Sequence, residues 1–210
     1  MVRRKWDSVT LGFMIIAGVG VFLVPFSFFL VVSLSPRFIH TLSLARVKGN
    51  VFDNVTQSTV KVEITVGPSG GCMWYNSSTP ICSAKIPYVP SAEYLHLPPN
   101  QNLTSIFPIA MGRALPMNHV MVILMGLCLI VAILDVFLFE GGIAWIIISF
   151  SSIMLWIVYF LESAYIKLLN TRIGNIYEHD SWEYHTGNGY ILVTVATFVA
   201  SIFICGSGGD

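Results

Sequence analysis

Four long apolar runs divide this chain of 210 residues, and they constrain its fold more than any other feature. They cover residues 11–34, 117–139, 143–168 and 189–205. A helix that crosses a bilayer needs about 20 apolar residues, and only helices or closed barrels satisfy their backbone hydrogen bonds in lipid. The runs therefore predict an all-α membrane protein, in which residues 1–210 form a single tetraspan domain around a four-transmembrane-helix bundle.

The composition agrees with this prediction. Hydrophobic residues make up 55% of the chain and charged residues only 10%, whereas soluble domains carry about 25% charged residues. The formal net charge of zero gives no general reason to expect a nucleic-acid partner. The sequence has no glycine-rich phosphate loop and no HExxH motif, and its spacing identifies no nucleophile–base pair. We therefore predict that the protein is not an enzyme and holds no cofactor or metal.

The first run follows a short basic segment that contains Arg3, Arg4 and Lys5. Such a segment also begins signal peptides, which leaves a cleaved leader as the alternative. The apolar stretch of a signal peptide is only about 7–15 residues long, so we expect this longer run to be retained as a helix, kinked at Pro25. Because basic residues favour the cytoplasmic side, the N-terminus is predicted to be cytoplasmic, and four crossings return the C-terminus to the same side.

The loop between the first two runs, residues 35–116, carries the N-x-Ser/Thr sequons of the chain. They begin at Asn54, Asn76 and Asn102. Such sequons accept glycans only on the lumenal or extracellular side of a membrane. Three of them in one loop predict that this loop is extracellular and that the protein is a glycoprotein.

The same loop has the pattern of a small β-sheet. Valine and isoleucine alternate with polar residues from Val60 to Val66, as in a strand with one buried face. Weaker alternation over residues 41–47 and 81–89 suggests two more strands, which suits the need for three or more strands in a stable sheet. Gly67, Gly70 and Gly71 are expected to form the turn that leads from the first strand to the cysteines.

The four cysteines fall into two classes. Cys72 and Cys82 lie in the extracellular loop with nine residues between them, whereas Cys128 and Cys205 lie within apolar runs. An oxidising compartment favours a disulfide between the exposed pair, worth roughly 2–3 kcal/mol of stability. Cys128 and Cys205 are expected to serve in packing.

Few polar side chains lie in or beside the predicted helices, and each is a candidate functional residue. Asp135 is close enough to the cytoplasmic end of its run to reach the interface, with a buried interhelical contact as the alternative. Glu162 is expected at the outer interface, and Arg113 just precedes the second run. A polar group in the second loop is interpreted as solvated rather than metal-binding; it consists of His179, Asp180, Glu183 and His185.

Trp74 and Tyr75 are the partner-binding candidates. They are expected to be exposed in the loop just after Cys72 and Met73, and a loop held by a sheet and a disulfide loses less entropy on binding than a mobile one. The alternative is that the disulfide serves only folding and export.

Taken together, these features resemble the claudin-like tetraspans. The Trp-Gly-Leu-Trp signature of claudins is replaced by Gly71-Cys72-Met73-Trp74, while Arg113 is similar to an arginine that claudins carry at that place. The resemblance is closer to the fungal SUR/PalI branch. It rests on a strand, a glycine-rich step, paired cysteines and short steps before the second run: Val62–Val66, Gly67–Gly71, Cys72, Cys82-Ser83, Pro87-Tyr88, Leu103-Thr104 and Pro108-Ile109-Ala110.

The resemblance implies a non-enzymatic organiser or accessory subunit at the fungal plasma membrane. In that branch the PalI group assists ambient-pH signalling through a membrane sensor, and the SUR group serves eisosomes and cell-wall integrity. The implied partners are membrane lipids together with a pH sensor, an eisosome component or a second copy of the chain. The alternative function is regulation of an ion channel or transporter, as in a related regulator of calcium influx.

Overall fold

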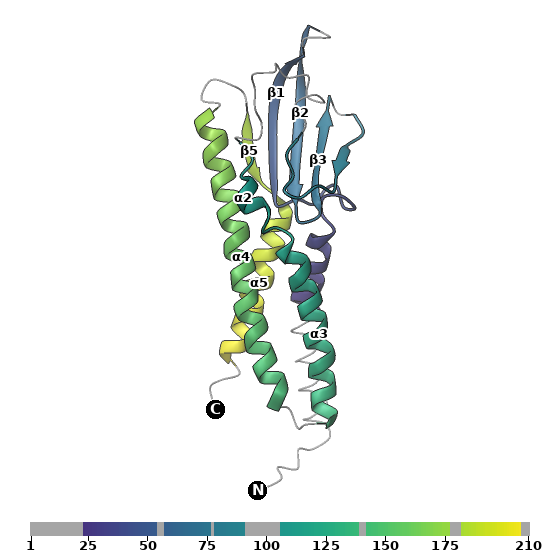
Figure 1. Cartoon of the computed structure of the whole chain (residues 1–210), viewed down its shortest axis with the longest axis vertical. Helices are drawn as coiled ribbons and strands as arrows, with labels where there is room; N and C mark the ends of the chain where they lie inside the picture. Colours follow the sequence, from purple (N-terminus) through teal and green to yellow (C-terminus); the bar gives the residue numbers. More distant parts are fainter. Residues whose placement is uncertain are drawn as a thin grey trace.

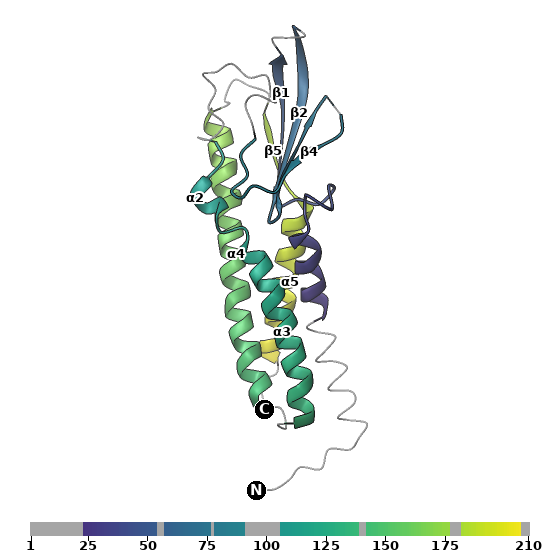
Figure 2. The same ribbon diagram turned by 45° about the vertical axis from the view of Figure 1, so that its right-hand side comes forward.

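A row of helices stands beneath an antiparallel β-sheet in the computed structural model (Figure 1). The structure describes residues 23–53, 57–76, 78–90, 106–138, 142–176 and 182–206. Figure 2, turned by 45°, shows the same two layers, with the sheet above the helices and α4 rising past the other helices beside it. The chain alternates between the layers, so both loops between helices contribute to the sheet.

The helices follow the apolar runs closely. They are Leu23–Ser33, α2 (Ile109–Gly112), α3 (Met117–Leu138), α4 (Gly142–Ile176) and α5 (Asn188–Gly206). The predicted starts at residues 117, 143 and 189 lie within one residue of the observed ones. Of the first run, residues 11–22 lie outside the described part.

Two of these helical segments are long and apolar enough to cross a membrane. They are Ile109–Val131, with a mean hydropathy of 2.1, and Ser149–Gly174, with a mean hydropathy of 1.5. The described parts of the other two, Leu23–Ser33 and Asn188–Ile202, are apolar but shorter. The structure thus combines apolar helices with an antiparallel sheet, as predicted, but the fold is not clearly all-α: the sheet has five strands, one of them from the second loop.

Large apolar side chains also point outward from the helices at helical spacing. On α4 the exposed residues are Ile146, Phe150, Ile153, Ile157 and Phe160. The same three- and four-residue spacing recurs on α3 and α5: Val120, Ile123, Leu127, Ile130 and Leu134; Ile191, Val195, Phe198 and Ile202. A helix that is apolar on its outward face as well as its inward face is typical of a lipid environment.

The sheet is antiparallel throughout, with the strand order β4-β3-β2-β1-β5. Its strands are β1 (Ala45–Asp53), β2 (Ser58–Gly67), β3 (Gly70–Tyr75), β4 (Ile81–Ser83) and β5 (Glu183–Thr186). The strand predicted over residues 60–66 is confirmed as the centre of β2, and its four apolar side chains are buried. Alternating burial is the reason these residues form a strand, because one face of the sheet covers the core.

Four strands of the sheet differ from the prediction. β1 lies further along the chain than residues 41–47, and β4 is only three residues long. β3 occupies the segment expected to be turn and disulfide, and the tight turn is made by residues 67–70 alone, where Gly70 has a φ of +124°. β5 comes from the second loop, which the sequence did not identify as a strand. Its four residues pair with the first half of β1, from Ala45 to Lys48.

The sheet and the helices share one hydrophobic core. The inner face of the sheet contributes Val47, Val62, Ile64 and Met73, which join a single buried cluster with side chains of all the long helices. The last turns of α4 take part through Leu169 and Ile173, which explains why this helix continues beyond the predicted end at residue 168. The sheet is therefore packed onto the helices rather than tethered by loops.

Candidate partner-binding face

The side of the sheet turned away from the core, here called the outer face, carries a set of charged side chains and one tryptophan. Its members are Arg46, Lys48 and Asn50 of β1, Lys61 and Glu63 of β2, Trp74 of β3, and Glu183 and His185 of β5. They share this face because successive residues of a strand point to opposite sides. The alternation that buries the valines of β2 thereby exposes Lys61 and Glu63.

Cross-strand pairing brings four of these side chains into one row. Lys48 is opposite Glu63 on one side and Glu183 on the other, and Glu63 is opposite Trp74. Such directly opposed residues have neighbouring side chains. The row thus runs from β5 to β3 across the middle of the sheet.

Glu63 lies between two cations. One carboxylate oxygen is 3.1 Å from Arg46 Nε and the other is 3.9 Å from Lys48 Nζ. Each of the three side chains is partly exposed, so these ion pairs contribute little to stability, about 0–1 kcal/mol each. Their effect is to fix the positions of charge on the outer face.

A shallow hollow of about 660 Å³ lies over this row. Its charged and aromatic lining consists of Lys48, Lys61, Glu63, Trp74 and Glu183. Lys61 makes no ion pair with any residue that the structure describes. A hollow with charges of both signs and a half-buried tryptophan differs from an apolar small-molecule pocket. It has the composition of a protein-binding surface, where tryptophan is enriched among the residues that dominate affinity.

The two aromatic candidates from the sequence lie on opposite faces. Trp74 belongs to the outer face, whereas Tyr75 is partly buried and packs against the core. Neither is the exposed loop residue that the sequence suggested: both belong to β3 and are partly buried, and they face opposite sides because adjacent residues of a strand alternate in direction. Trp74 remains as the aromatic contact.

Tyr184 of β5 and Tyr88, which covers Gly71 of β3, are neutral groups. Burial raises the pKa of Tyr88 to about 12 and also raises the pKa of Tyr184. Both stay protonated at physiological pH.

The disulfide lies at one edge of the sheet. Cys72 of β3 and Cys82 of β4 are directly opposed and are joined by a disulfide, the pairing that the sequence predicted. The bond fastens the short strand β4 to β3. Of the other cysteines, Cys128 is buried with its sulfur 2.8 Å from Ser151 Oγ of α4, a packing position, and the side chain of Cys205 lies outside the described part.

One glycosylation candidate can be placed. Asn76 is exposed just after β3, and its backbone N–H donates to the Lys61 carbonyl. Asn54 and Asn102 lie outside the described residues, as do His179 and Asp180 of the polar group in the second loop. Glu183 and His185 of that group are on β5, 3.4 Å apart between Oε2 and Nε2.

Glu162, which the sequence placed at the outer interface, is a buried residue. Its side chain is 1% exposed and lies between helices, where Asn118 Nδ2 donates a hydrogen bond of 2.9 Å to Glu162 Oε1. The other carboxyl oxygen and Asn118 Oδ1 are buried without a hydrogen-bond partner among the described residues. The sequence reasoning missed Asn118, although an asparagine in an apolar run is itself a signal.

The remaining polar candidates are not brought together. Arg113 is exposed directly after α2, and Asp135 is within α3, with a side chain outside the described part. Arg113 makes no ion pair with Glu162. The described residues therefore offer two candidate functional regions, the outer face of the sheet and the buried Asn118–Glu162 pair.

No protein-family model and no curated protein sequence matches this chain.

Proposed function

We propose that the chain is a non-enzymatic tetraspan protein of the plasma membrane, with claudin-like architecture, whose outer face binds the extracellular part of a partner membrane protein. The observation that carries the proposal is the outer face itself: a charged hollow with Trp74, on a sheet that shares one core with apolar helices. A rigid surface of this kind binds without first having to be ordered.

The resemblance to the fungal SUR/PalI branch supplies the cellular setting of the proposal. The protein acts as a membrane organiser or accessory subunit in pH-response signalling or in eisosomes and cell-wall integrity. The partner is then a pH sensor or an eisosome component, with a second copy of the chain as the other occupant. The outward apolar side chains of α3, α4 and α5 contact lipid.

Photo-crosslinking tests the partner-binding face. A crosslinking amino acid in place of Lys61 should give a discrete adduct with a membrane protein in living cells, and Trp74→Ala should lower its yield about tenfold or more, since losing a dominant interface residue costs 2 kcal/mol or more. The matched control places the same amino acid at Lys85, which is exposed after β4 and does not line the hollow. Equal adducts from both positions, or none from position 61, would contradict the proposal.

Topology has its own test. Because the proposal places the sheet outside the cell, glycosidase treatment should lower the apparent mass of the protein. Replacing Asn54, Asn76 and Asn102 together by glutamine should abolish that shift. A tag after residue 210 should stay protected from protease added to intact cells, and digestion of that tag would rule out the four-span arrangement.

The buried Asn118–Glu162 pair favours a second function, regulation of an ion channel or transporter of the calcium-influx type. Polar groups inside a helix bundle are often retained for function rather than stability. Flux measurements in cells separate the two functions. Under the second one, Glu162→Gln changes calcium influx while the crosslink at position 61 persists. Under the first, Trp74→Ala removes the crosslink and influx is unchanged.

A further inference from the structure

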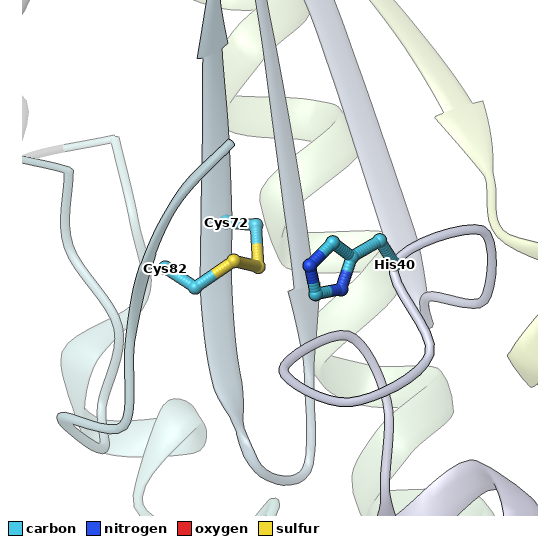
Figure 3. Close-up of side chains that lie close together, drawn as sticks. All are labelled: His40, Cys72 and Cys82. Carbon is cyan, nitrogen blue, oxygen red and sulfur yellow. A yellow bond between two sulfur atoms is a disulfide. The ribbon is translucent and has the colours of Figure 1, made fainter. Parts of the chain in front are cut away.

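A histidine lies beside the disulfide at the edge of the sheet. One ring nitrogen of His40 and the sulfur atoms of Cys72 and Cys82 all lie within 4.8 Å of one another. Figure 3 shows the imidazole next to the two sulfurs, with one nitrogen turned toward them. The three side chains come from separate segments: the turn before β1, β3 and β4. The fold thus gathers two sulfur atoms and one imidazole in one place.

His40 is held in the orientation of a metal ligand. Its Nδ1 is 3.0 Å from the carbonyl oxygen of Pro36, and since a carbonyl only accepts hydrogen bonds, Nδ1 carries the proton. Nε2 therefore has the free lone pair and is the nitrogen that faces the sulfurs (Figure 3). Histidines that bind metals commonly donate their other N–H to a backbone carbonyl in this way, which fixes both ring orientation and tautomer.

The three groups differ in exposure. His40 is exposed, Cys82 is half-buried and Cys72 is buried. A small reductant can therefore approach the Cys82 sulfur from solvent. The Cys72 sulfur lies 3.6 Å from the carbonyl oxygen of Pro36, so the thiol formed on reduction has an acceptor beside it.

We propose that reduction of the Cys72–Cys82 disulfide converts this cluster into a Cys₂His site for a soft divalent cation such as Zn²⁺. Two molecules of a small thiol reduce the disulfide; the S–S bond breaks, the thiols become one external disulfide, and each cysteine gains a proton. Binding of the cation then displaces these two protons, so that two thiolates and His40 Nε2 are the ligands. Thiolate and imidazole are the ligands that zinc prefers.

The local structure allows the change in sulfur spacing that the site requires. Zinc–sulfur bonds of about 2.3 Å in tetrahedral geometry place two sulfurs about 3.8 Å apart, so the cysteines must separate once the disulfide opens. β4 is a three-residue strand at the edge of the sheet and pairs only with β3 among the described strands. A small shift of β4 therefore disturbs little else. The fourth position stays open on the solvent side, as in zinc sites that bind a water or an external ligand.

Cadmium titration of the full chain in detergent micelles tests this site. Cd²⁺ stands in for Zn²⁺ because its thiolate bonds absorb in the ultraviolet. Cys128 and Cys205 are replaced by alanine to remove the other thiols. After reduction with a phosphine, the protein should bind about one Cd²⁺ per chain, whereas the oxidised protein should give no thiolate band. His40→Gln should weaken binding about tenfold or more, as even the loss of a supporting group at a metal site does.

His185→Gln is the matched control, because His185 lies on β5 at the opposite edge of the sheet. It should leave cadmium affinity unchanged. Protection from alkylation gives a second readout: Zn²⁺ should slow alkylation of Cys72 and Cys82 in the reduced protein and much less so in His40→Gln. A reduced protein that binds no Cd²⁺ overturns the proposal. The proposal is also overturned if the reduced His40→Gln protein binds Cd²⁺ as tightly as the reduced protein with His40. That result is expected if reduction unfolds the sheet and leaves only two free thiols to bind the metal.

Discussion

Replacing Asn118 by leucine should destabilise the protein more than replacing Asn118 and Glu162 by leucine together. The single change removes the donor of the 2.9 Å hydrogen bond and leaves the Glu162 carboxyl buried without a partner among the described residues. An unsatisfied buried polar group costs about 1–3 kcal/mol, whereas replacing both partners by apolar groups can be nearly neutral. The free energy of unfolding, measured by denaturant titration in mixed micelles, gives the comparison.

Glu162→Gln is the control for this pair. Its side-chain oxygen still accepts from Asn118 Nδ2, and its volume is almost unchanged, so we expect a loss of less than about 1 kcal/mol. If Asn118→Leu is as stable as the unchanged protein, the hydrogen bond contributes nothing to folding. If the protein with leucine at both positions is less stable than either single variant, Asn118→Leu or Glu162→Gln, the pair stabilises the fold through contacts other than this hydrogen bond.

A single methyl group at Gly49 should cost about 1–3 kcal/mol of stability, the usual penalty for overpacking. A Cβ built at this position of β1 overlaps the six-membered ring of Trp182, which covers the glycine. Gly49→Ala must therefore displace the indole or the strand. The midpoint of thermal unfolding in detergent should fall, together with the amount of protein at the cell surface.

Gly174→Ala supplies the opposite control. No described residue lies within 4 Å of a Cβ added at Gly174 on α4, so this change should raise stability by up to about 1 kcal/mol through helix propensity. Trp182→Ala in the Gly49→Ala background should recover part of the loss, because it removes the overlapping ring. Equal thermal midpoints for Gly49→Ala and the unchanged protein would show that the indole moves aside at no cost.

The sequence predicted the parts of the fold in which many residues repeat one signal. The starts of α3, α4 and α5 followed from apolar runs of helix length, and the centre of β2 followed from seven residues of strict alternation. The Cys72–Cys82 pairing followed from the two loop cysteines being separated from those in the helices. In each case one physical requirement, either burial or an oxidising environment, produces a pattern in the sequence. Such a pattern can be recognised without knowledge of the tertiary contacts.

The sequence did not reveal elements that depend on tertiary contacts. β5 has four residues, too few for a periodic signal, and it exists because the edge of β1 supplies its hydrogen bonds. β3 begins with two glycines, and Gly71 is required because the ring of Tyr88 covers it. Lys61 and Glu63 of the outer face were visible in the alternation of β2, but Lys48 and Glu183 became neighbours only through strand pairing.

The burial of Glu162 could not be predicted from the sequence. Its hydrogen-bond partner Asn118 is the second residue of α3, so the pair depends on how α3 and α4 pack together. The end of α4 was also predicted too early, because its last turns continue to Ile176 and pack against the sheet. Hydropathy alone does not distinguish a helix that leaves a membrane from one that ends there.

The pairing of β5 with β1 also determines when the sheet can be completed during synthesis of the chain. Ala45 to Lys48 emerge from the ribosome early, but their partners on β5 follow only after α4 has been synthesised. Until then one edge of β1 has open backbone groups, which can pair with other unpaired strands. Under the proposed four-span arrangement, the sheet is complete only once β5 reaches the same side of the membrane as the first loop. Completion of the sheet then depends on correct insertion of the last helices.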